Sequence, residues 1–295
     1  MTLMEGLTEV GDRTYRLEVP VPGAYVPTVS YFIKDGNGAL IEPGPGAAVP
    51  AVQSAIECLS LSQLAYIIPT HIHVDHAGGA GVLAKRYPKA DVLVHPRGAR
   101  HLADPAHLIE ITERIYGSDF ETRSGTVLPV PQSQLRVVAD REIMVLGGRE
   151  IQIIHAPGHS SHHLAILDRS QNGLFCGEAL GLPPHLLPSV APYSFDEDAY
   201  LRTIENLRHL HPHALFYSHG GMDTEPETAF SRAVENTHIY GAMVLEGIRN
   251  GDSRADIARR FAADVRQRFG LLFEPEGSEM FVTGYSMYYE KKGLA

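Results

Sequence analysis

Residues 66–79 read Tyr-Ile-Ile-Pro-Thr-His-Ile-His-Val-Asp-His-Ala-Gly-Gly, a short apolar run that leads into three histidines and an aspartate. His71 and His73 stand two residues apart, so both rings can converge on one metal ion at Zn–N distances of about 2.0–2.1 Å. Asp75 and His76 then turn toward a neighbouring position, because two more ligands on the same side of one ion would crowd it. The spacing therefore predicts a pair of metal sites.

A histidine-rich surface loop is the alternative interpretation of this stretch, since short motifs also arise without function. The flanking sequence argues against it. An apolar run typical of a strand precedes the cluster, and the pair Gly78-Gly79 follows it. A strand that ends in ligand-type side chains and a glycine turn favours the metal site.

Composition limits the class of protein. The chain has 295 residues, of which 44% are hydrophobic and 20% charged, as in an ordinary globular protein of one large domain or a domain with an appendage. A formal net charge of −10 argues against nucleic acid as the partner, because that binding depends on Lys and Arg contacts. We expect no membrane span, since no apolar run approaches about 18 residues. With no secretory signal and only two cysteines, a cytoplasmic protein is the expectation.

Hydrophobic periodicity predicts a mixed α and β protein, with an irregular turn at residues 20–23. Strand patterns are expected at residues 14–19, 29–33, 39–41, 65–68, 92–94, 137–138, 143–146, 151–154, 163–167, 173–176 and 214–217. Helical patterns are expected at residues 47–59, 80–87, 196–209, 225–249, 253–269 and 276–290, with a helical excursion between 102 and 130. From residue 225 onward the chain is therefore expected to be helical.

The stretch Thr-His-Ile-His-Val-Asp-His-Ala-Gly-Gly at residues 70–79 resembles the metal-binding signature of the metallo-β-lactamase-fold hydrolases. Three later segments match the family in order: His159 after Pro157-Gly158, Glu178 after an apolar strand, and His219 before a glycine pair. The matches cover roughly the first three quarters of the chain.

The resemblance implies an αββα sandwich, two packed β-sheets with helices outside, in residues 1–222. Residues 223–295 would form a C-terminal helical extension packed on it. The family pattern also implies the ligands. One site would use His71, His73 and His159, the other Asp75, His76 and His219, with Glu178 between or beside them.

Glu178 departs from the family, which usually has aspartate at the bridging position. The extra methylene moves the carboxylate outward, so either the backbone recedes to keep a bridge or Glu178 binds one ion only. Two zinc ions are the expectation, and iron, manganese or single occupancy stay open.

The family activity implies a metal-bound hydroxide that cleaves a small ester-like substrate, a thioester or lactone ahead of a β-lactam. Asp75 would be the catalytic residue, orienting the nucleophile or moving its proton. Two alternatives stay open: a non-haem iron dioxygenase of the same superfamily, and a ligand-binding regulatory protein with little turnover. A small molecule is the expected partner, and a homodimer is allowed.

Several residues are expected to support the site. In the family, an acidic residue at the position of Glu42 supports the metal loop. A solvated turn residue would look the same in the sequence. His163 would orient a ligand, whereas His95 is expected at the surface or in a loop. Cys176 is expected to be a buried core residue rather than a metal ligand. The proline-rich loop at residues 181–195 and the aromatic residues at 281–289 are expected to line the substrate pocket.

Overall fold

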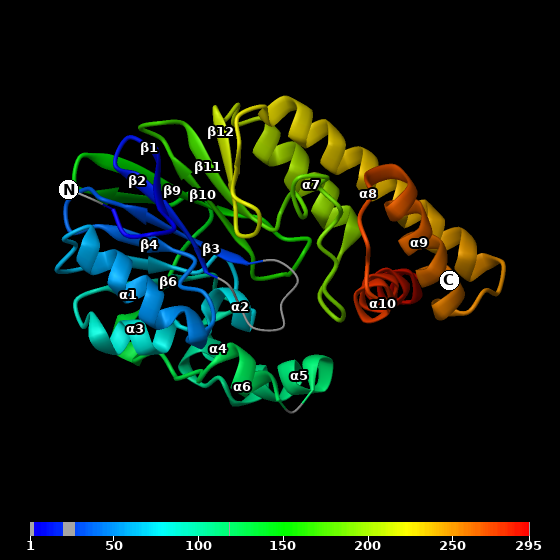
Figure 1. Ribbon diagram of the computed structural model, residues 1–295, viewed down its shortest axis with the longest axis horizontal. Helices are drawn as coiled ribbons and strands as arrows, with labels where there is room; N and C mark the ends of the chain where they lie inside the picture. The colour runs from blue at the N-terminus through cyan, green and yellow to red at the C-terminus, as the bar shows by residue number, and fades with distance from the viewer. Residues whose placement is uncertain (1–2, 20–26, 118, 295) are drawn as a thin grey trace. The chain divides into compact units, whose positions relative to one another are not determined.

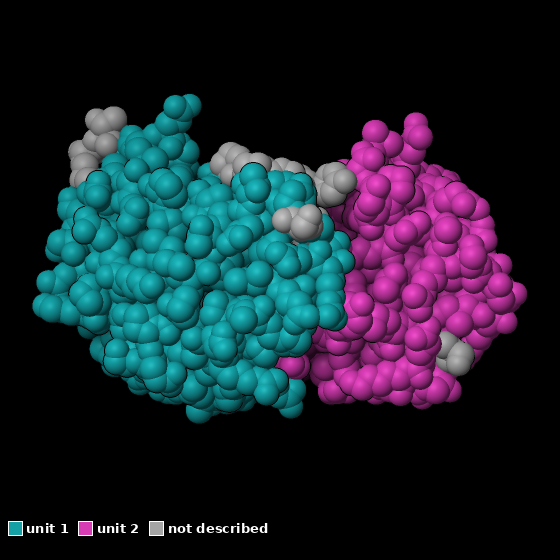
Figure 2. All heavy atoms as spheres, turned by 90° about the horizontal axis from the view of Figure 1, so that it is seen from below, with its two compact units in different colours: residues 1–155, 162–177, 212–224 teal, residues 156–161, 178–211, 225–295 magenta. Residues whose placement is uncertain are grey.

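The computed structural model describes residues 3–19, 27–117 and 119–294. The irregular turn expected at residues 20–23 lies outside these ranges. The chain divides into two compact units, coloured separately in Figure 2. The first comprises residues 1–155, 162–177 and 212–224, and the second comprises residues 156–161, 178–211 and 225–295. Each unit forms most of its residue contacts within itself.

Within the described residues, seven strands of the first unit form one sheet in sequence order. They are β1 (Leu7–Gly11), β2 (Thr14–Val19), β3 (Thr28–Ile33), β4 (Ala39–Ile41), β5 (Tyr66–Ile68), β6 (Asp91–Val94) and β7 (Leu135–Val137). Strands β1 to β4 are antiparallel, and β4 to β7 are parallel. Because parallel strands end at the same edge, the segments that follow β4 and β5 start side by side.

The second sheet of this unit has the order β13-β12-β11-β10-β9-β8 among the described residues (Figure 1). Its strands are β8 (Ile143–Leu146), β9 (Arg149–His155), β10 (Leu164–Asp168), β11 (Gly173–Gly177), β12 (Ala214–Tyr217) and β13 (Met222–Asp223). Strands β11 and β12 are parallel, and the other neighbours are antiparallel. The sequence patterns predicted these strands except β13, which is too short to show periodicity.

The helices of the first unit are short, and two of them cover the seven-stranded sheet. They are η1 (Gly46–Ala48), α1 (Val49–Cys58), α2 (Val74–Ala77), α3 (Ala80–Arg86), α4 (Ala99–Ala103), α5 (Ala106–Tyr116), α6 (Phe120–Ser124) and η2 (Gln132–Gln134). Apolar residues of α1 and α3 pack with Phe32, Leu40 and Ile67 in one buried cluster. The helices therefore protect the outer face of this sheet from water.

A second buried cluster lies between the inner faces of the two sheets. It combines Tyr31 and Ile68 of the first sheet with Ile153, Phe175 and Phe216 of the second. The Tyr31 ring meets those of Phe175 and Phe216 edge-on at 5.2 and 5.5 Å between centroids. Strand β3 is buried at every position because both faces of its sheet are covered. Two sheets flanked by helices confirm the predicted fold class.

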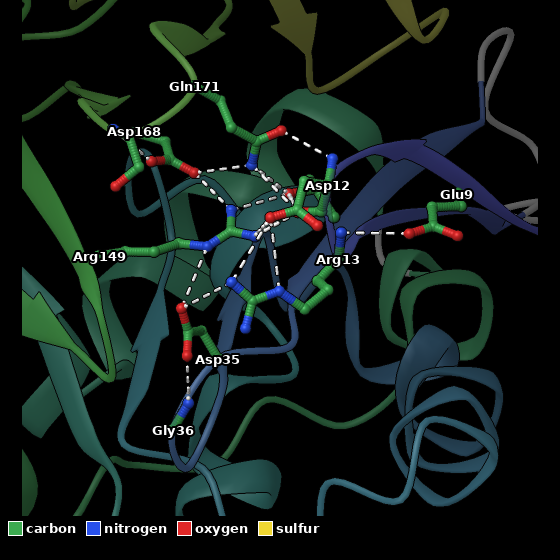
Figure 3. A network of polar contacts seen from close by, with 10 residues as sticks. Glu9, Asp12, Arg13, Asp35, Gly36, Arg149, Asp168 and Gln171 are labelled. Carbon is green, nitrogen blue, oxygen red and sulfur yellow. Dashed lines mark hydrogen bonds and ion pairs between the residues drawn. The ribbon is translucent and has the colours of Figure 1, made fainter.

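A polar network ties the turns of the two sheets together (Figure 3). Arg149 lies at its centre with only 2% of its side chain exposed, and its Nη1 is 2.6 Å from Oδ2 of the equally buried Asp168. Its other nitrogens reach Oδ2 of Asp35 at 3.5 Å and the backbone oxygen of Asp12. Gln171 Nε2 donates to the same Asp168 oxygen at 3.1 Å. One guanidinium therefore joins three turns that are distant in sequence.

The second unit contains α7 (Glu197–Arg208), α8 (Pro226–Arg249), α9 (Arg254–Phe269) and α10 (Pro275–Lys292), all predicted as helices. Side chains of Asp196 and Ser253 cap α7 and α9 by accepting from backbone N–H groups. The Phe195 ring lies 4.8 Å from that of Tyr285, so the proline-rich loop packs on α10. None of the helices in the described ranges is long and apolar enough to cross a membrane.

Residues 178–211 thus pack with the C-terminal helices in one unit. The predicted division into a metallo-β-lactamase-like domain at residues 1–222 and a C-terminal helical extension at residues 223–295 stays a prediction.

Candidate metal centre

The metal loop follows β5 directly, as predicted, but it ends in a short helix. His71 and His73 lie in the loop, and Asp75 and His76 lie in α2, whose first turn is closed by hydrogen bonds to the His73 carbonyl. The segment after β4 holds this helix, because Gly44 N donates to the His76 carbonyl at 3.0 Å. The parallel pairing of β4 and β5 therefore brings the two segments together.

Asp75, His76 and His219 form one group of ligand-type side chains within the first unit. Their ligand atoms all lie within 4.8 Å of one another. Asp75 Oδ2 is 3.2 Å from His76 Nε2 and 3.6 Å from His219 Nε2. His219 follows β12, so two sheets contribute to this group.

His71 and His73 form a second pair in the same unit. His71 Nε2 lies 2.9 Å from His73 Nδ1. The His71 ring is also 4.0 Å from that of His76 between centroids, so the pair adjoins the first group. Two ligands of one ion at ~2.0–2.1 Å with roughly tetrahedral angles lie ~3.0–3.5 Å apart. The spacings in the two groups, 2.9 to 3.6 Å, lie within about 0.1 Å of this range, so they are compatible with shared metal ions.

The histidines are oriented by hydrogen bonds at their second ring nitrogen. His71 Nδ1 is 3.0 Å from Thr70 Oγ1, and His219 Nδ1 is 3.1 Å from the Pro27 carbonyl oxygen. A carbonyl oxygen only accepts, so Nδ1 of His219 carries the proton and Nε2 presents its lone pair. Such partners fix the tautomer and the ring direction of a metal ligand.

Glu42 is the shared acceptor of this arrangement. It is 1% exposed and accepts from Thr70 Oγ1 at 2.5 Å and from Thr70 N at 3.3 Å. Its Oε1 also lies 3.2 Å from His76 Nδ1 and accepts from Ser218 Oγ. Its φ of 58° is unusual for a non-glycine residue, and these contacts hold it there. Of the two interpretations of Glu42, the supporting role agrees with this geometry.

In the second unit, His159 and Glu178 form a further pair. His159 Nε2 is 3.1 Å from Glu178 Oε2, and His159 Nδ1 donates to the Ser189 carbonyl at 3.0 Å. Tyr200 Oη donates to the Glu178 carbonyl at 3.2 Å. Gly158 is required before His159, because a Cβ at this position would lie 2.4 Å from Tyr200 Cα. This pair too has the spacing and the anchored ring of metal ligands.

Comparison with known proteins shows the family of this chain. The sequence model of the metallo-beta-lactamase superfamily matches residues 24–219, well over half of the chain. The chain belongs to the metallo-beta-lactamase superfamily.

Individual relatives are distant. A metallo-beta-lactamase fold-containing protein of Sulfurisphaera tokodaii is 29% identical over 167 residues, which are 55% of this chain and 62% of the relative. A hydroxyacylglutathione hydrolase of Albidiferax ferrireducens is 28% identical over 165 residues, 55% of this chain and 51% of the relative. The chain thus spans less than two thirds of either relative.

Among solved structures, a metallo-beta-lactamase family protein from Thermus thermophilus superposes with a TM-score of 0.74 at 20% identity. The superposition covers 95% of this chain and 94% of that protein. At this identity the likeness concerns the fold.

In this metallo-beta-lactamase superfamily member, two further histidines lie beside the ligand candidates. His163 is fully buried, with its ring 5.0 Å from that of His71. Gly177 makes room for it, because a Cβ there would lie 2.6 Å from His163 Nε2. The half-buried His162 lies 5.6 Å from the His73 ring, and sequence reasoning missed it. Its place beside His163 in a His-His pair was the available signal.

Ser189, Ser218 and Thr70 were also missed, because a hydroxyl has no diagnostic spacing. Cys176 is buried and donates from Sγ to the Phe216 carbonyl at 3.3 Å, as expected for core packing. Burial raises the pKa of its thiol well above the ordinary value.

His95 lies in the loop after β6, as expected, but it is buried rather than at the surface. Its ring lies 4.2 Å from that of His155. Burial, together with the neighbouring His155, lowers the pKa of His95 to about 4. His95 therefore stays neutral at neutral pH and serves packing.

Proposed function

We propose that this chain is a metal-dependent hydrolase that cleaves a small ester-like bond, a thioester or a lactone. The observation that supports the proposal best is the group of Asp75, His76 and His219, in which both histidines are anchored at Nδ1 and direct Nε2 toward one carboxylate. Such preorganisation is typical of metal ligands. The relative named as a hydroxyacylglutathione hydrolase adds support, because an acyl group on the glutathione thiol is a thioester.

The residues fit two metal ions. Asp75, His76 and His219 would hold one ion, and His71 and His73 are candidates for the other within the same unit. His159 and Glu178 are the further candidate ligands, in the second unit. Imidazole and carboxylate ligands suit zinc, and iron or manganese accept the same donors. A bound ion of this kind supplies Lewis acidity and a water of lowered pKa.

The protein's own residues provide orientation and proton transfer. His71 and His76 are at most 1% exposed, so the protein excludes water from one side of the centre. The side chain of Asp75, in contrast, is 46% exposed. Its carboxylate can therefore meet a substrate, orient the attacking water and accept the water's proton at an oxygen. Glu42 keeps the His76 ring in place during this step.

The substrate of the proposal is a small molecule rather than a nucleic acid. The net charge of −10 opposes binding of a phosphate backbone. The two carboxylates among the proposed ligands also suit metal binding better than direct anion binding.

The test combines metal analysis with a substrate panel. Protein prepared without added metal is analysed for Zn, Fe and Mn, and then assayed on matched esters, thioesters and lactones. We expect one to two ions per chain and hydrolysis that a chelator abolishes. His76→Ala should lower both metal content and activity, whereas the exposed-site control Arg169→Met should change neither. A wild-type protein that takes up no metal contradicts the proposal.

A second candidate is non-haem iron oxygen chemistry. Two histidines and one carboxylate meet in the group of Asp75, His76 and His219, and this is the donor set of many Fe(II) oxygenases. Firmly held iron with thiol-dependent oxygen consumption would favour this candidate. Metal binding without turnover of any substrate would favour a ligand-binding regulatory protein instead.

A further inference from the structure

Ser189 contacts both metal-ligand candidates of the second unit through different atoms. Its backbone oxygen accepts from His159 Nδ1 at 3.0 Å, and its hydroxyl donates to Glu178 Oε1 at 2.7 Å. Its backbone N–H donates to Tyr200 Oη at 3.4 Å. Ser189 is 6% exposed and lies in the proline-rich loop, outside every motif that the sequence analysis used.

Glu178 needs such a contact more than aspartate would. Glutamate has one more rotatable bond between backbone and carboxylate, so either oxygen can rotate toward a metal. A charge-assisted hydrogen bond from a hydroxyl favours one of these orientations. With the hydroxyl on Oε1, Oε2 lies 3.1 Å from His159 Nε2, at the spacing of two ligands of one ion.

We propose that Ser189 is a positioning residue of the metal centre, which selects Oε2 of Glu178 as the coordinating oxygen and Nε2 of His159 as the coordinating nitrogen. This inference rests on the proposed metal-dependent function. It explains how a glutamate serves at a position where the superfamily signature usually has aspartate. The loop thereby sets ligand geometry in addition to any contact with substrate.

The hydroxyl and the carbonyl of Ser189 can be tested separately. Ser189→Ala removes the hydroxyl and keeps the carbonyl that His159 uses. Ser194→Ala is the matched control, since Ser194 lies in the same loop and donates to the His159 carbonyl at 3.2 Å without touching the carboxylate. If Ser189→Ala does not fold, Ser189→Cys retains the size and donates a much weaker hydrogen bond.

The readouts are the dissociation constants for Zn²⁺ and Co²⁺, from competition with a chromophoric chelator, and the visible absorption spectrum of the Co²⁺ form. We expect Ser189→Ala to weaken the metal site that uses His159 and Glu178 about 10- to 100-fold, as loss of a residue behind a metal ligand typically does. The Co²⁺ spectrum should change as well, whereas Ser194→Ala should leave both unchanged. A merely structural role would not alter the spectrum of a folded variant.

A Glu178→Asp background completes the experiment. The shorter carboxylate cannot keep the same contact, so Ser189→Ala should have a smaller effect there than in the wild-type background. Equal effects in both backgrounds overturn the role assigned to Glu178 Oε2. Wild-type affinity and spectrum in Ser189→Ala overturn the inference and leave the proposed function standing. Absence of metal binding in the wild-type protein overturns both.

Discussion

Replacing the buried Arg149 by methionine tests the network that joins the turns of the two sheets (Figure 3). The change removes the 2.6 Å contact to Asp168 and a hydrogen bond to Thr14 Oγ1 at 3.2 Å. The Asp168 carboxylate is 2% exposed, and Gln171 Nε2 and the Ser170 N–H remain as its donors. Removing one partner of a buried ion pair leaves an uncompensated charge and costs about 3–5 kcal/mol. We expect a loss of this size in the free energy of unfolding.

The assay is denaturant unfolding followed by circular dichroism, since the chain contains no tryptophan. Arg169→Met is the matched control. Arg169 pairs with Glu150 at 2.7 Å, but the two side chains are 45% and 56% exposed, so its loss should cost at most about 1 kcal/mol. The double variant Arg149→Met/Asp168→Asn should be more stable than Arg149→Met, because it removes the unpaired charge. Equal losses for the two arginine variants, or a double variant less stable than Arg149→Met, would refute the reasoning.

Three further outcomes are expected. The unfolded chain binds a proton at His95 near pKa 6.5 and the folded chain only near 4, so the free energy of unfolding should fall as pH drops through this window. His95→Gln should reduce that slope relative to wild type in pH-dependent unfolding, and an unchanged slope contradicts the assignment. Glu42→Gln should weaken the metal site of His76 about 10-fold or more in chelator competition, and unaltered affinity would argue against its supporting role. Gly177→Ala should lower the free energy of unfolding by about 1–3 kcal/mol, because φ of residue 177 is 56° and the new Cβ would meet His163. An unchanged melting temperature in thermal unfolding would show instead that the end of the strand relaxes.

Much of the fold followed from patterns in the sequence. Strands such as β3 and β10 are rich in apolar residues because both faces of their sheets are covered, and helices such as α7 carry an apolar stripe. Strand β1, strand β13 and helix α2 were not predicted. For β13 and α2 the reason is their length. Two and four residues are too few to show a period, and long-range pairing or hydrogen bonds to neighbouring segments stabilise them instead.

The sequence by itself determined the local half of the candidate metal centre. His71, His73, Asp75 and His76 lie within six residues, so their short spacing restricts where the side chains can point once the strand before them ends. The later ligand candidates were identified only through the order of the family motifs. No local spacing connects His219 with His76.

Only the tertiary structure decided which groups orient these ligand candidates. The carbonyl of Pro27 anchors His219 across 192 positions of sequence, and the carbonyl of Ser189 anchors His159 across 30. Every residue has a backbone carbonyl, so such partners leave no mark in the amino-acid sequence. The hydroxyl of Ser189 is equally inconspicuous, because its role depends on the distance to Glu178 after folding. Packing therefore decides the long-range hydrogen bonds, whereas the types of the candidate ligands and their short spacing can be read directly from the sequence.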